Sequence, residues 1–275
     1  MKVAIQGELG SFSHEATMLL VPDAATIACG TAEQVLRALS DSECDAAVIP
    51  VENSLAGSVI DFYNLFFDHE FAIERELEMR VRHNLIAAGG TALKSIRRVF
   101  SHPVALAQCR QFFAANPQFE AVPFYDTAGS VQHIMRSNNP EWAAIAGKQA
   151  AAEYGAKILQ EGIEDRSESY TRFWLIRRRG CAAHRSSPTK LSIAFLLENR
   201  PGALLQALGT FAARNLNLTK IESRPMTGRP WEYLFYADVG VHGDAQADAV
   251  IEDLKHICST VKELGRYCVS NPASK

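Results

Sequence analysis

The chain has 275 residues, a size that at roughly 150 residues per domain indicates one large domain or two unequal ones. Hydrophobic residues make up 47% and charged residues 21%, which excludes a disordered, coiled-coil or collagen-like chain. The 28 Lys and Arg residues nearly balance 31 Asp and Glu residues, so no basic excess is present to bind nucleic acid. No apolar run approaches the ~18–20 residues that cross a membrane, and no export signal is evident, so we expect a soluble, cytoplasmic protein.

The six cysteines include no C-x-x-C pair, and the eight histidines form no H-E-x-x-H motif. In a long chain without an export signal, this pattern favours buried free thiols over disulfides. It also predicts no metal site.

The first two thirds of the chain alternates short β-rich runs with helical patterns. Strands are predicted over residues 3–6, 46–50, 71–78, 84–88, 98–100, 119–125, 142–146 and 172–176. Helices are predicted over residues 13–20, 31–39, 104–116, 129–137 and 148–154. This alternation predicts α/β layers with largely parallel sheets.

Residues 177–190 break that pattern, because they are basic and turn-rich and have no apolar period. They could tether nucleic acid, but the balanced overall charge favours a solvated linker. Beyond them, strands are predicted over 191–197, 216–226, 231–240 and 267–269, and helices over 202–214 and 244–258. The order β-α-β-β-α-β predicts a ferredoxin-like domain, whose open face or edge often pairs with another copy.

Small polar residues follow four predicted strands of the first part, over residues 6–14, 50–58, 101–103 and 126–130. In α/β sheets, ligands bind beyond the carboxyl ends of strands, where helix N-termini present free N–H groups. One such junction is most often a cap and a turn, but four together predict a cleft for a small anion. The phosphate-loop and G-x-G-x-x-G motifs are both missing, so nucleotides are not favoured.

These junctions carry a family resemblance. In order and spacing, five motifs of this chain resemble those of prephenate dehydratases. They are Gln-Gly-x-x-Gly-Ser-Phe-Ser (6–13), Pro-Val-Glu-Asn-Ser-x-x-Gly (50–57), Ser-His-Pro-x-Ala-Leu-x-Gln-Cys (101–109), Asp-Thr-Ala (126–128) and Thr-Arg-Phe (171–173). Two further motifs resemble the regulatory ACT domain of the same family: Asn-Arg-Pro-Gly-Ala-Leu (199–204) and Glu-Ser-Arg-Pro (222–225).

The resemblance implies a division of the chain. Residues 1–178 would form a two-lobed catalytic domain like a type II periplasmic binding protein, with the site between the lobes. One lobe would be roughly residues 1–78 plus the terminal strand 172–176, and the other residues 80 to about 155. Residues 179–189 would be a linker, and residues 190–275 a ferredoxin-like ACT domain. The family implies a homodimer or homotetramer formed through both domains.

The resemblance also implies an activity: prephenate becomes phenylpyruvate, with loss of water and carbon dioxide, in phenylalanine biosynthesis. L-Phenylalanine would inhibit through the C-terminal domain, and no metal, nucleotide or organic cofactor is implied. Hydroxide is a poor leaving group at neutral pH, so a positioned donor is needed to protonate it or hydrogen-bond to it.

The family motifs assign that donor role to Thr171, with Asn53, Ser101 and Gln108 orienting the substrate. Phe173 would form an apolar wall, which favours decarboxylation because it weakens solvation of the carboxylate. Further implied substrate contacts are Arg172, Ser54, Thr127, Ala128 and Ser11. Without the family match, Thr171 is an ordinary strand residue and Gln108 a surface one.

Three residues within these motifs have other possible roles. Arg172 could hold a substrate carboxylate or form a structural ion pair. His102 is expected to pack or to cap a helix, and Asp126 to cap one.

In the regulatory part, the N–H groups of Gly202, Ala203 and Leu204 open a helix and could take an amino-acid carboxylate. The resemblance adds Glu222, Ser223, Arg224 and Pro225 to an L-phenylalanine site between paired ACT domains. By binding there, L-phenylalanine would act as an allosteric inhibitor.

One position departs from the family pattern. Many members have Asn two residues before the motif threonine, where this chain has Ser169. The substrate preference between prephenate and arogenate therefore stays open, as do the oligomer size, whether inhibition acts on affinity or turnover, and the response to other amino acids. The alternatives are an arogenate dehydratase and, in other classes, a non-catalytic solute-binding protein or an amino-acid sensor.

Overall fold

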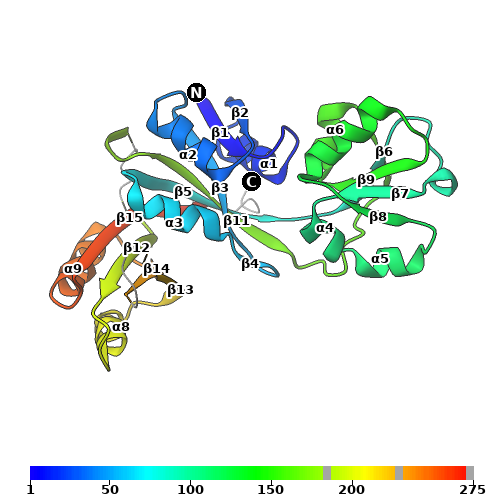
Figure 1. The fold of residues 1–275 in the computed structure, drawn as a ribbon. Coiled ribbons are helices and arrows are strands. Elements are labelled where there is room, and N and C mark those ends of the chain that lie inside the picture. Colours follow the sequence, from blue (N-terminus) through cyan, green and yellow to red (C-terminus); the bar gives the residue numbers. More distant parts are fainter. Residues whose placement is uncertain (182–186, 227–231, 271–275) are drawn as a thin grey trace. The chain divides into compact units, whose positions relative to one another are not determined.

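The computed structural model describes residues 1–181, 187–226 and 232–270 (Figure 1). By contacts, the chain forms two compact units. Unit 1 contains Met1–Phe62 and Leu77–Phe173, and unit 2 contains Tyr63–Glu76 and the described residues from Trp174 onward. These units do not follow the predicted domain boundaries, which stay predictions. Parts of the predicted linker (182–186) and of the predicted ACT domain (227–231 and 271–275) lie outside the described residues.

The first lobe of unit 1 is a parallel sheet with helices packed on it (Figure 1). Its elements are β1 (Lys2–Gln6), α1 (Phe12–Leu20), β2 (Ala25–Cys29), α2 (Ala32–Ser40) and β3 (Ala46–Asn53), with β4 (Gly57–Ser58) antiparallel to the end of β3. The apolar stripe of α2, formed by Val35, Leu36 and Leu39, is fully buried. Helical spacing of apolar residues therefore sets the face that α2 turns to the sheet.

The second lobe of unit 1 is a five-stranded sheet in the order β10-β6-β9-β7-β8. Its elements are β6 (Asn84–Ala87), a 3-10 turn (Leu93–Ser95), β7 (Arg98–Ser101), α4 (Pro103–Ala107), α5 (Arg110–Ala115), β8 (Glu120–Pro123), α6 (Thr127–Ser137), β9 (Trp142–Ala146), α7 (Lys148–Tyr154) and β10 (Lys157–Gln160). Helices cover both faces: one core includes residues of α4 and α5, and the other includes residues of α6 and α7.

Unit 2 contains the predicted β-α-β-β-α-β order. Its elements are β12 (Lys190–Leu197), α8 (Ala203–Ala213), β13 (Leu218–Pro225), β14 (Tyr233–Gly240), α9 (Asp244–Lys255) and β15 (Thr260–Ser270). The strands pair antiparallel in the order β13-β14-β12-β15, and α8 and α9 share a core with one face of the sheet. The ferredoxin-like prediction is confirmed, with β13 at the edge.

Two long strands, β5 (Phe71–Arg80) and β11 (Tyr170–Arg178), begin in one unit and end in the other. Helix α3 (Ile60–Asp68) precedes β5, and a 3-10 turn (Arg179–Cys181) follows β11. In the hydrogen-bonded order, β5 neighbours β15 in unit 2, and β11 neighbours β3 in unit 1.

A buried polar network lies at the unit 2 ends of β5 and β11. The Glu76 carboxylate, with a residue exposure of 2%, pairs with Lys190 Nζ at 2.7 Å and accepts hydrogen bonds from Trp174 Nε1 at 3.0 Å and Tyr267 Oη at 3.2 Å. Tyr267 Oη lies 2.7 Å from the hydroxyl of Ser192.

Several sequence expectations need correction. The sheets are mixed rather than largely parallel, because β6 pairs antiparallel with both β9 and β10. The helix predicted over 104–116 is divided into α4 and α5, since the Asp165 carboxylate accepts hydrogen bonds from the N–H groups of Arg110 and Gln111 and caps a new helix. Strands β2 and β10 and helix α3 were not predicted, and β15 is far longer than 267–269. In the described part of the chain, no helix has the length and hydrophobicity to cross a membrane.

Candidate functional site

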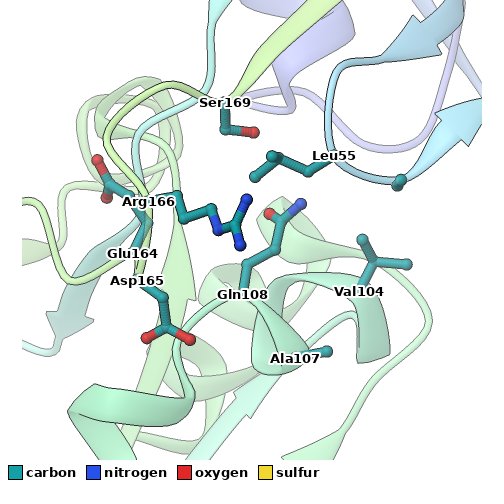
Figure 2. Close-up of a pocket in the computed structure, with 9 residues that line it drawn as sticks. Leu55, Val104, Ala107, Gln108, Glu164, Asp165, Arg166 and Ser169 are labelled. Atoms are coloured by element: carbon teal, nitrogen blue, oxygen red, sulfur yellow. The ribbon is translucent and has the colours of Figure 1, made fainter.

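A pocket of about 520 Å³ in unit 1 is lined by side chains from both lobes. Most of its residues lie at strand ends and helix starts. The first lobe and the neighbouring strand β11 contribute Gln6, Ser11, Phe12, Asn53, Thr171 and Phe173. The second lobe and the segment leading into it contribute His83, His102, Gln108, Asp126 and Thr127. An adjoining pocket of about 430 Å³ shares Ala56, Val104 and Gln108 with it (Figure 2). We call the larger pocket the candidate site.

The amide of Asn53 has a fixed orientation. Its Oδ1 accepts hydrogen bonds from the backbone N–H groups of Leu55 and Ala56, at 3.0 and 2.9 Å. With the oxygen held this way, Nδ2 faces β11 and donates to the Thr171 hydroxyl oxygen at 2.9 Å and to the Ser169 hydroxyl oxygen at 3.3 Å. Thr171 therefore accepts from Asn53, and its own proton stays available for a ligand.

Gln108 ends helix α4 and meets a buried histidine. Its Oε1 lies 2.8 Å from Nε2 of His83, which fits a neutral ring that donates from Nε2. The Gln108 amide nitrogen is then left to donate elsewhere. The backbone N–H of His83 donates to Glu164 Oε2 at 2.9 Å, and the imidazole ring packs edge-on against Phe12.

Three helices begin at the candidate site, each capped by a side chain. Ser11 caps α1, His102 caps α4, and Asp126 caps α6 by accepting from Gly129 N–H at 2.7 Å. The capping readings of His102 and Asp126 are confirmed. Burial raises the pKa of Asp126, with Glu8 adding to that shift.

The adjoining pocket contributes a cation. Figure 2 shows the Arg166 guanidinium extending toward the carboxamide of Gln108. Arg166 has no recorded ion pair among the described residues, and no Lys or Arg lines the candidate site itself. An anionic ligand that spans the two pockets would meet its positive charge here.

The structure does not bring every predicted residue to the candidate site. Ser101 is fully buried at the end of β7 and donates to the Ile145 carbonyl oxygen at 2.6 Å. Arg172 forms an ion pair with Glu52 at 2.6 Å, and Ser54 donates to the Glu168 carbonyl oxygen. Ala128, in the first turn of α6, is buried in the core that α6 and α7 form with the sheet. These four do not line the pocket, whereas Thr171, Asn53, Gln108, Phe173, Thr127 and Ser11 do.

Sequence reasoning missed His83 and Arg166. His83 directly precedes the buried strand 84–88, a position that carries no local signal of a ligand site. Arg166 lies in an acidic, polar run before β11, which reads as solvated loop. Among the described residues, no group of three His, Cys, Asp or Glu side chains could hold a metal.

His83 predicts an acid-sensitive stability. Burial lowers the pKa of His83 below its ordinary value of about 6.5. The unfolded chain therefore takes up the proton first as the pH falls, and stability is lost from about pH 6.5 down to the folded pKa. His83→Gln should remove up to about 1.4 kcal/mol per pH unit of that slope. Urea unfolding between pH 5 and 7 measures it, with the exposed His242→Gln as the control, and equal slopes in all three proteins would contradict this role.

In unit 2, a smaller pocket of about 160 Å³ lies at the start of α8. Ala203 and Leu204 line it, together with Leu197, Glu198, Asn199, Arg200, Tyr233 and Phe235. Gly202 is the N-cap of α8 and has a φ of +81°. Glu222, Ser223, Arg224 and Pro225 lie on the edge strand β13 and do not line the pocket, although Ser223 and Pro225 pair across the strands with Phe235 and Tyr233.

Comparison with known families identifies the chain. A family model for prephenate dehydratase matches residues 3–181, and an ACT domain model matches residues 191–256. The chain is therefore an enzyme of the dehydratase class with a C-terminal ACT domain. It belongs to the prephenate dehydratase family.

Curated relatives carry two substrate names. Arogenate dehydratase 1 of Petunia hybrida is 37% identical over 97% of this chain and 66% of its own length. Arogenate dehydratase/prephenate dehydratase 2 of Arabidopsis thaliana, described as chloroplastic, is 36% identical over 98% of this chain and 73% of its own. The predicted cytoplasmic location stays a prediction.

Two solved structures share the whole fold. Prephenate dehydratase from Arthrobacter aurescens, in complex with L-Phe, is 33% identical and covers 98% of this chain and 90% of that one, with a TM-score of 0.88. GqqA, described as a novel type of quorum quenching acylase, is 32% identical and covers 100% of both chains, with a TM-score of 0.90. The predicted fold class is confirmed.

Proposed function

We propose that this chain is a decarboxylating prephenate dehydratase of phenylalanine biosynthesis, inhibited by L-phenylalanine. The observation that carries the catalytic part is the Asn53–Thr171 hydrogen bond in a pocket built from both lobes. The family match supports the reaction class, and the L-Phe complex of the Arthrobacter relative supports the regulation. For the domains we keep residues 1–178 as catalytic, 179–189 as linker and 190–275 as regulatory.

The reaction needs a proton for a departing hydroxide. As the ring carbon–oxygen bond breaks, the Thr171 hydroxyl donates its proton, so that the hydroxide leaves as water. The Asn53 amide N–H steadies the charge that develops on the threonine oxygen. The carbon–carbon bond between the ring and its carboxylate breaks, and carbon dioxide leaves. The electron pair of that bond stays with the ring and completes its aromatic system. Solvent then returns the proton to Thr171.

The surroundings suit that chemistry. Phe173 is buried and lines the pocket beside Thr171, so it can face the ring of the substrate. Gln108, held through His83, offers an amide N–H, and Arg166 offers a positive charge for a carboxylate. We assign these as substrate-orienting groups together with Thr127 and Ser11. Ser101, Arg172, Ser54 and Ala128 act behind them as structural supports.

The choice between prephenate and arogenate is tested directly. Purified chain is supplied with each compound, and phenylpyruvate and phenylalanine are quantified. Higher kcat/KM for prephenate supports the proposal, and higher kcat/KM for arogenate would replace it with an arogenate dehydratase. Binding of both without turnover would point to a solute-binding protein.

The acylase description of GqqA gives a second activity to assay. An acylase requires a nucleophile activated by a base. Here the hydrogen-bond partner recorded for the Thr171 hydroxyl is the Asn53 amide, which is not a base. We therefore expect no turnover of an acylated quorum-sensing signal, and release of its acyl group would contradict that expectation.

Regulation is assigned to the pocket at the start of α8. We propose that L-phenylalanine binds there, with Gly202, Ala203 and Leu204 receiving its carboxylate. A second copy would close the site through β13, whose residues Glu222 to Pro225 lie at the sheet edge, giving a homodimer or homotetramer. Light scattering with and without L-phenylalanine measures the assembly.

Gly202→Asp is expected to raise the L-phenylalanine concentration for half inhibition at least tenfold while it spares uninhibited turnover. A side chain at φ +81° strains the backbone, and the new carboxylate would repel the carboxylate of L-phenylalanine. Gly209→Ala, elsewhere in α8 with open space around its added carbon, is the matched control. Unchanged inhibition in Gly202→Asp would place the amino acid elsewhere.

A further inference from the structure

A further cavity of unit 1, about 410 Å³ in volume, is lined by three basic and two acidic side chains together with uncharged ones. Its walls come from α1, from the end of β5, from the segment that leads into β6 and the first residue of β6, from the start of α7, and from β10 and the residue after it. The lining residues are Phe12, Glu15, Arg80, Arg82, Asn84, Lys148, Ile158 and Glu161. Of the residues that the structure describes, only Phe12 is shared with the candidate site.

Among the described residues, the cationic groups of this cavity form no salt bridge, although the charge of Lys148 acts on the nearby Glu15 carboxylate. Arg80, Arg82 and Lys148 outnumber Glu15 and Glu161, and in the residues that the structure describes none of the three cations has a recorded ion pair. The Nε of Arg80 is buried and has no hydrogen-bond partner. Because buried donors are almost always paired in folded proteins, this nitrogen lacks an acceptor that a ligand can supply.

The charge and shape of the cavity define the occupant. A guanidinium presents a planar set of donors that matches the two oxygens of a carboxylate or phosphate group. The excess of positive charge selects an anion, and the volume exceeds that of an inorganic ion alone. We propose that this cavity binds a small organic anion through a carboxylate or phosphate group held by Arg80, Arg82 and Lys148.

The occupant would lie next to a wall of the candidate site. Phe12 lines both cavities, and its ring packs against His83 on one side. Gly147 makes room for that ring, since an added Cβ would lie 2.9 Å from it. An anion that contacts Phe12 would therefore touch a residue that also borders the candidate site.

Calorimetric titration of the full chain tests the proposal at constant ionic strength. Malonate probes a carboxylate ligand, and inorganic phosphate probes a phosphate ligand. We expect saturable binding of at least one probe, weakened at least tenfold in Arg82→Gln/Lys148→Gln. Both positions are exposed, so this variant keeps the buried core intact. Arg80→Gln tests the buried nitrogen, and Arg37→Gln, on the exposed side of α2, is the charge-matched control.

Each outcome decides the matter. Tighter binding of malonate or of phosphate identifies which group the cavity prefers. Equal binding by the wild type and the double variant, or no saturable binding of either probe, overturns the proposal. If Arg166→Gln lost binding while Arg82→Gln/Lys148→Gln bound the probe as the wild type does, the anion would be assigned to the candidate site instead. None of these readouts depends on the reaction, so the proposed function can fail without affecting them.

Discussion

Thr171→Ala should lose turnover of prephenate by about 10²–10⁴-fold, the usual contribution of a positioned proton donor. The side chain is small and lies at the pocket wall, so its removal costs little packing while it deletes the hydroxyl that Asn53 orients. KM for prephenate should change much less than kcat. Steady-state kinetics with phenylpyruvate detection measures both.

Two variants control this experiment. Thr171→Ser keeps the hydroxyl and should retain far more activity than Thr171→Ala. Tyr170→Phe changes an exposed neighbour on the same strand and should be near the wild type. Wild-type turnover in Thr171→Ala would remove Thr171 from the mechanism. Equal loss in the Ser and Ala variants would indicate a packing role.

Glu76→Ala should destabilise the fold by about 3–5 kcal/mol, the range for breaking a buried ion pair on one side. It would leave the Lys190 ammonium buried, and it would also remove an acceptor from Trp174 Nε1 and Tyr267 Oη. The melting temperature should fall by roughly 10 °C. Urea unfolding followed by tryptophan fluorescence gives the free energy.

Glu78→Ala is the matched control, since it removes an exposed carboxylate two residues along β5. It should change stability by less than about 0.5 kcal/mol. A Glu76→Ala protein as stable as this control would show that the network contributes little. Glu76→Gln, which keeps one acceptor oxygen, should fall between the two.

Much of the fold was predictable because it rests on local patterns. The apolar stripe of α2 at helical spacing and the β-α-β-β-α-β order of unit 2 are readable from neighbouring residues. The antiparallel placement of β6 was not, because strand direction depends on partners far away in the chain. The break between α4 and α5 depends on Asp165, more than fifty residues away.

The candidate site divides in the same way. Family motifs selected Asn53 and Thr171, which are 118 residues apart and meet in the structure. The motifs could not show that the Ser101 hydroxyl is taken up by a neighbouring strand, or that Arg172 faces Glu52. His83 and Arg166 carry no motif signal, and only the fold places them against Gln108 and its pocket.

The composition of unit 2 limits how relatives of this chain can be recombined. Its buried residues include Tyr63 and Trp174, which precede the proposed linker, and Tyr236, which follows it. The Tyr236 hydroxyl donates to the Tyr63 carbonyl oxygen, and the rings of Trp174 and Tyr236 both pack against the Tyr63 ring. A chimera joined at residues 179–189 would combine aromatic partners from two parents inside one core. Hybrid enzymes that exchange the proposed regulatory domain therefore need matched residues at 63–76 and 174–178 as well. A crossover at the proposed linker alone would leave aromatic residues in this core that do not fit one another.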